Sequence, residues 1–240
     1  MPLLGPLPGF PSRCDGAASR LRVAALLLVA AAAFGTAHAG TFVRAPALQA
    51  GGALEGTVSL PAPVTRTAER YVGTDGSPRD VPIIPVVVYV QGDVAVAAAR
   101  PSAPPRVAQR GETFHPGLLV VPLGTTVAFP NEDPVFHNVF SYSRPKRFDL
   151  GRYRRGESKD VRFDRPGYVK VMCEVHKWMR AGILVVDNPF YAIADDAGRF
   201  RIGGLPPGRH RLVAESFDRR ADTIDVDVAP GGTVKVQVRF

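Results

Sequence analysis

Short apolar segments separated by glycine- and proline-rich turns make up the chain after about residue 50. Segments 118–121, 125–129, 158–163 and 168–172 are rich in β-branched or aromatic residues, and several alternate between apolar and polar positions. This alternation is typical of half-buried strands. The many turns fit 24 glycines and 23 prolines among 240 residues. The pattern therefore predicts an all-β fold.

Six further segments share these properties and are also predicted to be strands. They are 54–60, 83–90, 182–186, 210–215, 223–228 and 233–240. Three polar or proline-rich segments between strands, 61–80, 92–110 and 141–157, are interpreted as loops. In the last of these, Phe148 and Leu150 are expected to anchor the loop on the core.

The N-terminal segment has the organisation of a secretory signal. Three arginines precede an apolar run at 23–35, and Ala37-His38-Ala39 fits the small-residue cleavage rule. The run is short for a membrane anchor, which is the alternative reading. We expect residues 1–39 to be a signal peptide and the protein, from Gly40, to be periplasmic or secreted with no remaining membrane span.

Signal cleavage would change the cysteine count. The chain has two cysteines, Cys14 and Cys173, and cleavage would leave Cys173 alone. A lone cysteine in an exported protein is a liability, half of an intermolecular disulfide, or a metal ligand. The metal reading is favoured because a histidine and a methionine follow Cys173 within six residues.

The spacing Cys173-x-x-His176-x-x-Met179 places three metal-binding side chains in one short segment. Apolar, β-branched strands flank it, which favours a tight loop over a helix. His137, from a separate strand, is the predicted fourth ligand. A thiolate, two imidazoles and a weak thioether form the ligand set of a blue-copper electron-transfer site. We therefore predict one type-1 copper ion.

Other chemistries fit these residues less well. Zinc accepts a cysteine and two histidines but has little use for a methionine. A cysteine hydrolase would need an oxyanion site and an orienting third group, and neither is evident. The sequence has no His-x-His pair, which argues against a multicopper oxidase. We expect an electron carrier that is not a stand-alone enzyme.

Two neighbours of the ligands are expected to support them. Asn138 follows His137 and is predicted to tie the two ligand segments together by a hydrogen bond. Trp178 lies between two ligands in the sequence. It fits either the mouth of the site, with His176 as the exposed edge, or plain core packing.

Two histidines and an acidic pair lie outside this set. His115 and His210 are interpreted as surface or structural residues. Asp195 and Asp196 lack the further carboxylates of a calcium site and are interpreted as part of a turn.

The chain is basic, with a formal charge of +8. Removing residues 1–39 takes away three arginines and one aspartate, which would leave +6. Between residues 144 and 165, nine basic residues outnumber four acidic ones. This region is either a solvated loop and strand edge or a surface that steers toward an acidic redox partner. No nucleic-acid recognition motif is present, so no nucleic-acid partner is expected.

The central segments resemble the cupredoxins, and most closely the amicyanin/plastocyanin group and related methylamine-utilisation-like proteins. The resemblance lies in Phe129-Pro130-Asn131-Glu132-Asp133, His137-Asn138-Val139-Phe140-Ser141, Phe148-Asp149-Leu150-Gly151, Pro166-Gly167 and the Cys173–Met179 loop. It covers about residues 114–187. It implies a Greek-key sandwich, type-1 copper and one-electron transfer.

The C-terminal segment resembles a second family, the carboxypeptidase regulatory-like (transthyretin-like) β-sandwich modules. The resemblance lies in Asp196-Ala197-Gly198-Arg199-Phe200, interpreted as a hairpin turn, and in Gly204-Leu205-Pro206-Pro207-Gly208. The early strands of that family match Gly56-Thr57-Val58 and Val86-Val87-Val88. The resemblance implies a small sandwich built from about 50–95 and 188–240, with a cupredoxin inserted.

Together these predictions divide the chain into a signal peptide at 1–39, N-terminal strands and a loop at 40–104, a cupredoxin domain at 105–187 and a regulatory-like module at 188–240. Three functions remain open. They are a one-electron carrier, a periplasmic copper-binding or delivery protein, and a non-redox structural or ligand-binding β-module. The intact ligand set disfavours the third, and reversible redox as against easy Cu(I) release would separate the first two.

Overall fold

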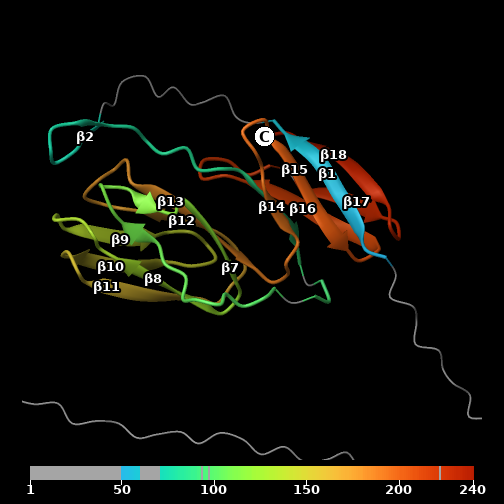
Figure 1. The fold of residues 1–240 in the computed structure, drawn as a ribbon, viewed down its shortest axis with the longest axis horizontal. Helices are drawn as coiled ribbons and strands as arrows, with labels where there is room; N and C mark the ends of the chain where they lie inside the picture. Colours follow the sequence, from blue (N-terminus) through green and yellow to red (C-terminus); the bar gives the residue numbers. More distant parts are fainter. Residues whose placement is uncertain (1–49, 60–70, 93, 97, 222) are drawn as a thin grey trace, which may run out of the picture. The chain divides into compact units, whose positions relative to one another are not determined.

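The computed structural model describes residues 50–240 apart from 60–70, 93, 97 and 222 (Figure 1). The predicted signal peptide and its cleavage site lie outside the described residues. Eighteen strands and no helix occur in the described part, so the predicted all-β class is confirmed. Among these residues there is accordingly no helix with the length and apolar character needed to cross a bilayer.

The middle of the chain forms a sandwich of two sheets, here called the central sandwich. Its five-stranded sheet has the order β10-β9-β12-β13-β7, and β11 pairs with β8 to form the second sheet (Figure 1). The strands are β7 (Leu118–Pro122), β8 (Thr125–Pro130), β9 (His137–Ser141), β10 (Phe148–Tyr153), β11 (Ser158–Phe163), β12 (Gly167–Met172) and β13 (Arg180–Val186).

Alternating apolar positions hold the two sheets of the central sandwich together. Phe129 on β8 and Phe163 on β11 are fully buried, and they share one apolar cluster with Val139, Val169 and Ile183 of the five-stranded sheet. Because side chains on a strand point alternately to its two faces, this periodicity directs one face of each sheet inward.

The remaining long strands form a second pair of sheets, here called the flanking sandwich. One sheet has the order β15-β1-β18 and the other β14-β4-β16-β17. The strands are β1 (Gly52–Val58), β4 (Val87–Gln91), β14 (Tyr191–Ile193), β15 (Arg199–Leu205), β16 (Gly208–Glu215), β17 (Ile224–Val228) and β18 (Thr233–Val238). Leu54, Val88, Phe200, Leu212 and Val226 lie in its apolar core.

Two short hairpins complete the strands. β2 (Tyr71–Val72) pairs with β3 (Pro78–Arg79), and β5 (Ala108–Gln109) pairs with β6 (Phe114–His115). Both precede the central sandwich in the chain, and both contribute residues to the site described below.

Several of the predicted loop and strand limits are wrong. The predicted loop 61–80 contains the short strands β2 and β3. β10 occupies the middle of the predicted loop 141–157, although Phe148 and Leu150 do pack against the core as expected. The predicted loop 92–110 ends in buried residues and the strand β5. The strand predicted at 83–90 begins only at Val87, because Pro85 has no N–H to donate and Ile83 is exposed.

The segment 194–202 is a turn, but its two strands do not form a hairpin. Gly198 has φ 77° and its N–H donates to the Asp195 carbonyl, which forms the predicted turn. The strands on either side separate, since β14 pairs with β4 while β15 pairs with β1. The chain thus crosses from one sheet of the flanking sandwich to the other.

Candidate metal centre

The predicted ligands come from two places at one end of the central sandwich. His137 is the first residue of β9, and Cys173, His176 and Met179 lie in the short connection between β12 and β13. This connection contains bends and turns but no helix, as predicted. The Met179 N–H donates to the His176 carbonyl at 2.9 Å, which folds the connection back on itself.

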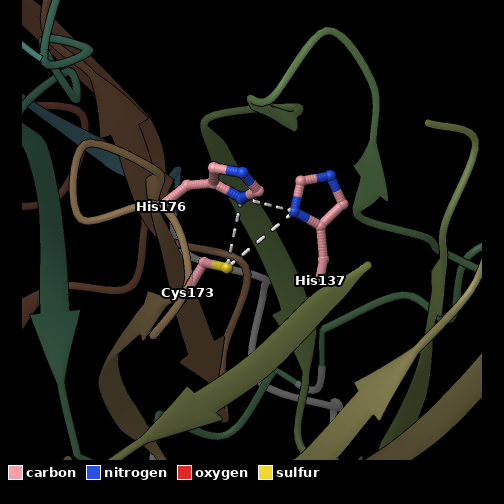
Figure 2. Close-up of side chains that lie close together, drawn as sticks. All are labelled: His137, Cys173 and His176. Carbon is pink, nitrogen blue, oxygen red and sulfur yellow. Dashed lines mark hydrogen bonds between the residues drawn. The ribbon is translucent and has the colours of Figure 1, made fainter. Parts of the chain in front are cut away.

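Three of the four side chains converge on one point (Figure 2). The Nδ1 atoms of His137 and His176 lie 2.9 Å apart, and each lies 3.9 Å from Cys173 Sγ. All three residues are buried, with exposed fractions of 0%, 3% and 4% for His137, Cys173 and His176. A thiol and two imidazoles with their nitrogens directed at one point can hold a metal ion.

Met179 is buried in the same apolar cluster as Cys173. Its role as a fourth, weaker ligand stays a prediction. Of the four predicted ligands, the structure therefore brings His137, Cys173 and His176 into a single cluster and places Met179 in the surrounding core.

A buried carboxylate orients His137. Asp133 Oδ2 lies 2.9 Å from His137 Nε2, the ring nitrogen that faces away from the cluster. Asp133 also accepts the N–H groups of Gly111 and Glu112. Burial acts to raise the pKa of Asp133, but these hydrogen bonds and His137 outweigh it and hold the pKa below its usual value. The ionised carboxylate fixes the ring so that Nδ1 faces the cluster.

Asn131 holds the loop that leads to His137. Its amide donates to the carbonyls of Val135 and Tyr153, and its side-chain oxygen accepts the Asp133 N–H. These bonds satisfy buried backbone groups of a loop whose sheet pairing is a single bridge between Asn131 and Gln109. The position of Asp133 is thereby fixed before any metal binds.

Asn138 ties the two ligand segments together, as predicted. Its side-chain oxygen accepts the N–H of Glu174, the residue after Cys173, at 2.6 Å. Its amide donates to Asp149 on the neighbouring strand β10 at 3.3 Å. The strand that carries His137 and the loop that carries Cys173 are therefore held in register by one side chain.

His176 is buried, so the prediction that it forms an exposed edge is wrong. The Trp178 ring packs edge-to-face on it with centroids 5.0 Å apart, and Trp178 is itself buried. Trp178 Nε1 donates to the Glu112 carbonyl at 3.0 Å. Of the two readings of Trp178, the structure shows core packing. Burial, and then the proximity of His137, lower the pKa of His176, which favours the neutral, metal-binding form.

Two functional neighbours were missed in the sequence. Asp133 precedes His137 by four residues in a tight loop. A carboxylate at that distance could have been predicted to bind the histidine ring. Glu112 lies in the connection between β5 and β6 and contacts both Asp133 and Trp178. No local sequence pattern marks it. The residues set aside behave as expected, since His115 is exposed and His210 is hydrogen-bonded to the Pro206 carbonyl.

Asp195 also behaves as a turn residue. Its carboxylate accepts the N–H groups of Ala197 and Arg199 and pairs with the Arg199 guanidinium. Both carboxylate oxygens are used in these local contacts, as in an Asx turn. The reading of Asp195 and Asp196 as a turn is confirmed for Asp195.

Comparison with solved structures finds copper proteins. A copper-containing nitrite reductase from Thermus scotoductus SA-01 is 29% identical over 40% of this chain, with a TM-score of 0.34, and the chain spans 25% of its length. A purple cupredoxin from Nitrosopumilus maritimus is 24% identical over 34% of the chain and 99% of its own, at a TM-score of 0.32. A reduced amicyanin mutant is 18% identical over 41% of the chain and 98% of its own, at 0.33.

No family model matches the sequence, and no curated protein matches it. Each of these three solved structures overlaps less than half of this chain. The chemistry proposed below therefore rests on the residues of this chain.

Proposed function

We propose that this protein is an exported, mononuclear type-1 copper protein that carries one electron between redox partners, with His137, Cys173, His176 and Met179 as ligands. The observation that carries the proposal is the convergence of Cys173 Sγ with two histidine Nδ1 atoms in a buried cluster. A thiolate and two imidazoles suit both Cu(II) and Cu(I).

The supports of the ligands favour electron transfer. A carrier works fast when its ligands move little between the two redox states. Asp133 fixes the His137 ring, Asn138 fixes the Cys173 loop, and Trp178 packs on His176. When copper is bound it supplies the one-electron couple, and the chain supplies a site that needs little reorganisation.

The same burial weighs against a copper-delivery role. A delivery protein has to release its ion to a partner, which is easier when the ligands reach the surface. Here the three converging ligands are almost wholly covered. The carrier is therefore the preferred function, and delivery remains the alternative that the redox experiment below distinguishes.

The partner is proposed to be a redox protein with an acidic docking surface. The basic region at 144–165 includes the edge strand β10, the strand β11 and the connection between them. Arg144, Arg147, Arg155 and Arg165 in this region are exposed. Arg152 approaches Glu174 to 3.8 Å, which brings the basic region to the ligand loop. Such charge would speed encounter with an acidic partner at low salt.

Localisation and the flanking sandwich complete the proposal. The signal sequence supports a periplasmic or secreted protein. We propose that the flanking sandwich is the regulatory-like module, because β1 and β4 pair with strands that follow residue 188. In this arrangement the domain at 105–187 is an insertion, and the module is a support or binding unit without chemistry of its own.

The test is the visible spectrum of the purified protein after addition of Cu(II). In the protein from Gly40 we expect an intense blue thiolate-to-copper band that is lost in Cys173→Ser and kept in His115→Gln, a control substitution at an exposed histidine outside the cluster. Cyclic voltammetry should show a reversible one-electron wave. A colourless protein, or a blue protein that gives up Cu(I) readily and shows no reversible wave, would contradict the carrier function.

A further inference from the structure

The His176 side of the centre is covered by the β2–β3 hairpin, which lies about a hundred residues earlier in the chain. Tyr71 of β2 packs on Trp178 with ring centroids 5.6 Å apart, and Trp178 packs on His176 at 5.0 Å. Tyr71 is only half-buried. The three rings therefore form an unbroken series of contacts from a buried ligand to a side chain at the surface.

Glu112 fastens the hairpin in this position. Its carboxylate accepts the N–H of Thr74 at 2.9 Å and the hydroxyl of the same residue, and it pairs with Arg79 Nε at 3.2 Å. The Glu112 side chain is 5% exposed. A buried carboxylate without partners is costly, so the hairpin and Glu112 depend on each other.

The backbone of Glu112 connects this fastening to both histidines. Its N–H donates to Asp133 Oδ2 at 2.8 Å, and that oxygen also contacts His137 Nε2. Its carbonyl accepts the Trp178 indole N–H. Glu112 has φ 55°, a left-handed conformation that is uncommon for a residue other than glycine. Here it directs the N–H, the carbonyl and the side chain to three partners of the same site.

We propose that Tyr71 and Trp178 lie on the path of the electron between His176 and one of the two redox partners, and that this partner contacts the hairpin at 71–79, whereas the acidic partner docks at the basic region 144–165. This inference rests on the proposed function. Electronic coupling falls steeply with distance, and the buried His176 offers no ring edge for direct contact. Rings in van der Waals contact bridge that distance.

The transfer itself is simple in atoms and charge. Copper held by His137, Cys173, His176 and Met179 would supply the electron, with Cu(I) becoming Cu(II), and the partner's one-electron acceptor would gain it. No bond forms or breaks, no proton moves, and neither ring is itself oxidised. The β2 strand of the hairpin suits a protein partner, since Val72 is 57% exposed beside Tyr71.

The first test compares substitutions at Tyr71 in the full chain. Tyr71→Leu keeps an apolar cover but removes the ring, whereas Tyr71→Phe keeps the ring and removes the hydroxyl. Stopped-flow oxidation of the Cu(I) protein by hexacyanoferrate(III) should slow severalfold in Tyr71→Leu and stay at the wild-type rate in Tyr71→Phe. Tyr142→Leu, at a tyrosine that is 70% exposed outside the site, is the matched control and should not change the rate.

The blue band and the reduction potential should be unchanged in all three variants, which separates a lost path from a damaged centre. A wild-type rate in Tyr71→Leu would overturn the proposed path. A faster rate would also overturn it, because the hairpin would then act only as a barrier to the reagent.

The second test needs no copper. Trp178 is the only tryptophan of the chain, so tryptophan fluorescence of the metal-free protein reports how well the Trp178 ring is shielded from a quencher in solution. Tyr71→Ala should increase quenching by acrylamide severalfold. Quenching equal to that of the wild type would show that the hairpin does not cover Trp178 and would overturn the proposal.

The outcomes also separate this inference from the proposed function. A wild-type protein without a blue band would remove the carrier function and the electron path with it. If the protein is blue and redox-active but Tyr71→Leu has the wild-type rate, the carrier function is supported and only the proposed path is overturned.

Discussion

The central and flanking sandwiches share an architecture but differ in what they bury. Both have apolar cores rich in valine and phenylalanine. Eleven polar or charged residues are buried in the described part of the chain, and nine of them lie between residues 109 and 180. Burying a polar group is unfavourable unless it is hydrogen-bonded. Folding of the central part therefore requires hydrogen-bond partners for many more buried polar groups than folding of the flanking sandwich does.

The buried polar groups also do different things in the two sandwiches. In the flanking sandwich, the Asn188 amide donates to the carbonyls of Val90 and Gly92, and its side-chain oxygen accepts the Phe190 N–H. These three partners are backbone groups, and the remaining partner is the neighbouring Asp187 carboxylate. In the central sandwich, Asp133 and Asn138 bind backbone groups and also position the His137 ring or the Cys173 loop. Buried polar residues therefore separate a supporting sandwich from one built around a site.

The largest expected effect tests whether the flanking sandwich is only a support. Phe200→Ala removes a buried ring from its core and should lower the free energy of unfolding by about 3–5 kcal/mol. Denaturant unfolding measures this loss. Protein that remains folded should keep the blue band unchanged. Ile193→Ala, at an exposed position, should change stability by no more than about 0.5 kcal/mol.

A blue band that shifts in folded Phe200→Ala protein would contradict this division of roles. It would show that the packing of the flanking sandwich reaches the ligands, and the comparison between the two sandwiches would fail.

A smaller effect is expected from Asp133→Asn in the central sandwich. The amide has the same shape, but it cannot accept all the donors that Asp133 now satisfies, so the His137 ring loses its fixed orientation. Copper affinity should fall about 10–100-fold, measured by competition with a Cu(I) chelator. Glu132→Gln changes the adjacent carboxylate, which pairs with arginines at the surface, and should leave the affinity unchanged. Equal affinity in Asp133→Asn would mean that the carboxylate serves only the backbone of its loop.

The smallest effect concerns Glu215, the carboxylate of β16 that accepts the Tyr89 hydroxyl at 3.1 Å. Burial raises its pKa above the usual value, against the opposing effects of Arg220 and the Tyr89 hydroxyl. The folded state therefore holds the proton more tightly than the unfolded chain. The stability that this proton provides is full below the unfolded pKa and is lost as pH rises through the folded pKa.

Glu215→Gln should remove that loss, so its melting temperature should fall less than that of the wild type between about pH 4 and pH 8. Glu55→Gln, at an exposed ion pair with Arg201, should keep the wild-type slope. Parallel pH profiles for wild type and Glu215→Gln would contradict the expected role of burial at this carboxylate.

Much of the fold could be read from the sequence because its signals are local. The strands at 125–130, 158–163 and 167–172 carry their own alternation, and the ligand loop carries its own spacing. β10 escaped prediction because it is an edge strand with exposed charges and a glycine, and an edge strand needs few apolar positions.

The parts of the site that could not be predicted depend on contacts between distant segments. The sequence around His176 contains nothing to indicate burial, because its cover comes from Tyr71 and from the hydrogen bond between Trp178 and Glu112. Asn138 could be assigned its role because it follows a ligand directly. The limits of the domains remain a prediction based on the two resemblances.

The pairing of β1 sets an order of events for the growing chain. β1 lies between β15, to which it is antiparallel, and β18, to which it is parallel. Both partners are separated from β1 in the chain by the whole central sandwich, and contacts between such distant segments are slow to form. In a chain made from its N-terminus, both edges of β1 stay unpaired until β15 has been made, and the second edge waits for β18. The first described strand is therefore one of the last elements that can enter its sheet.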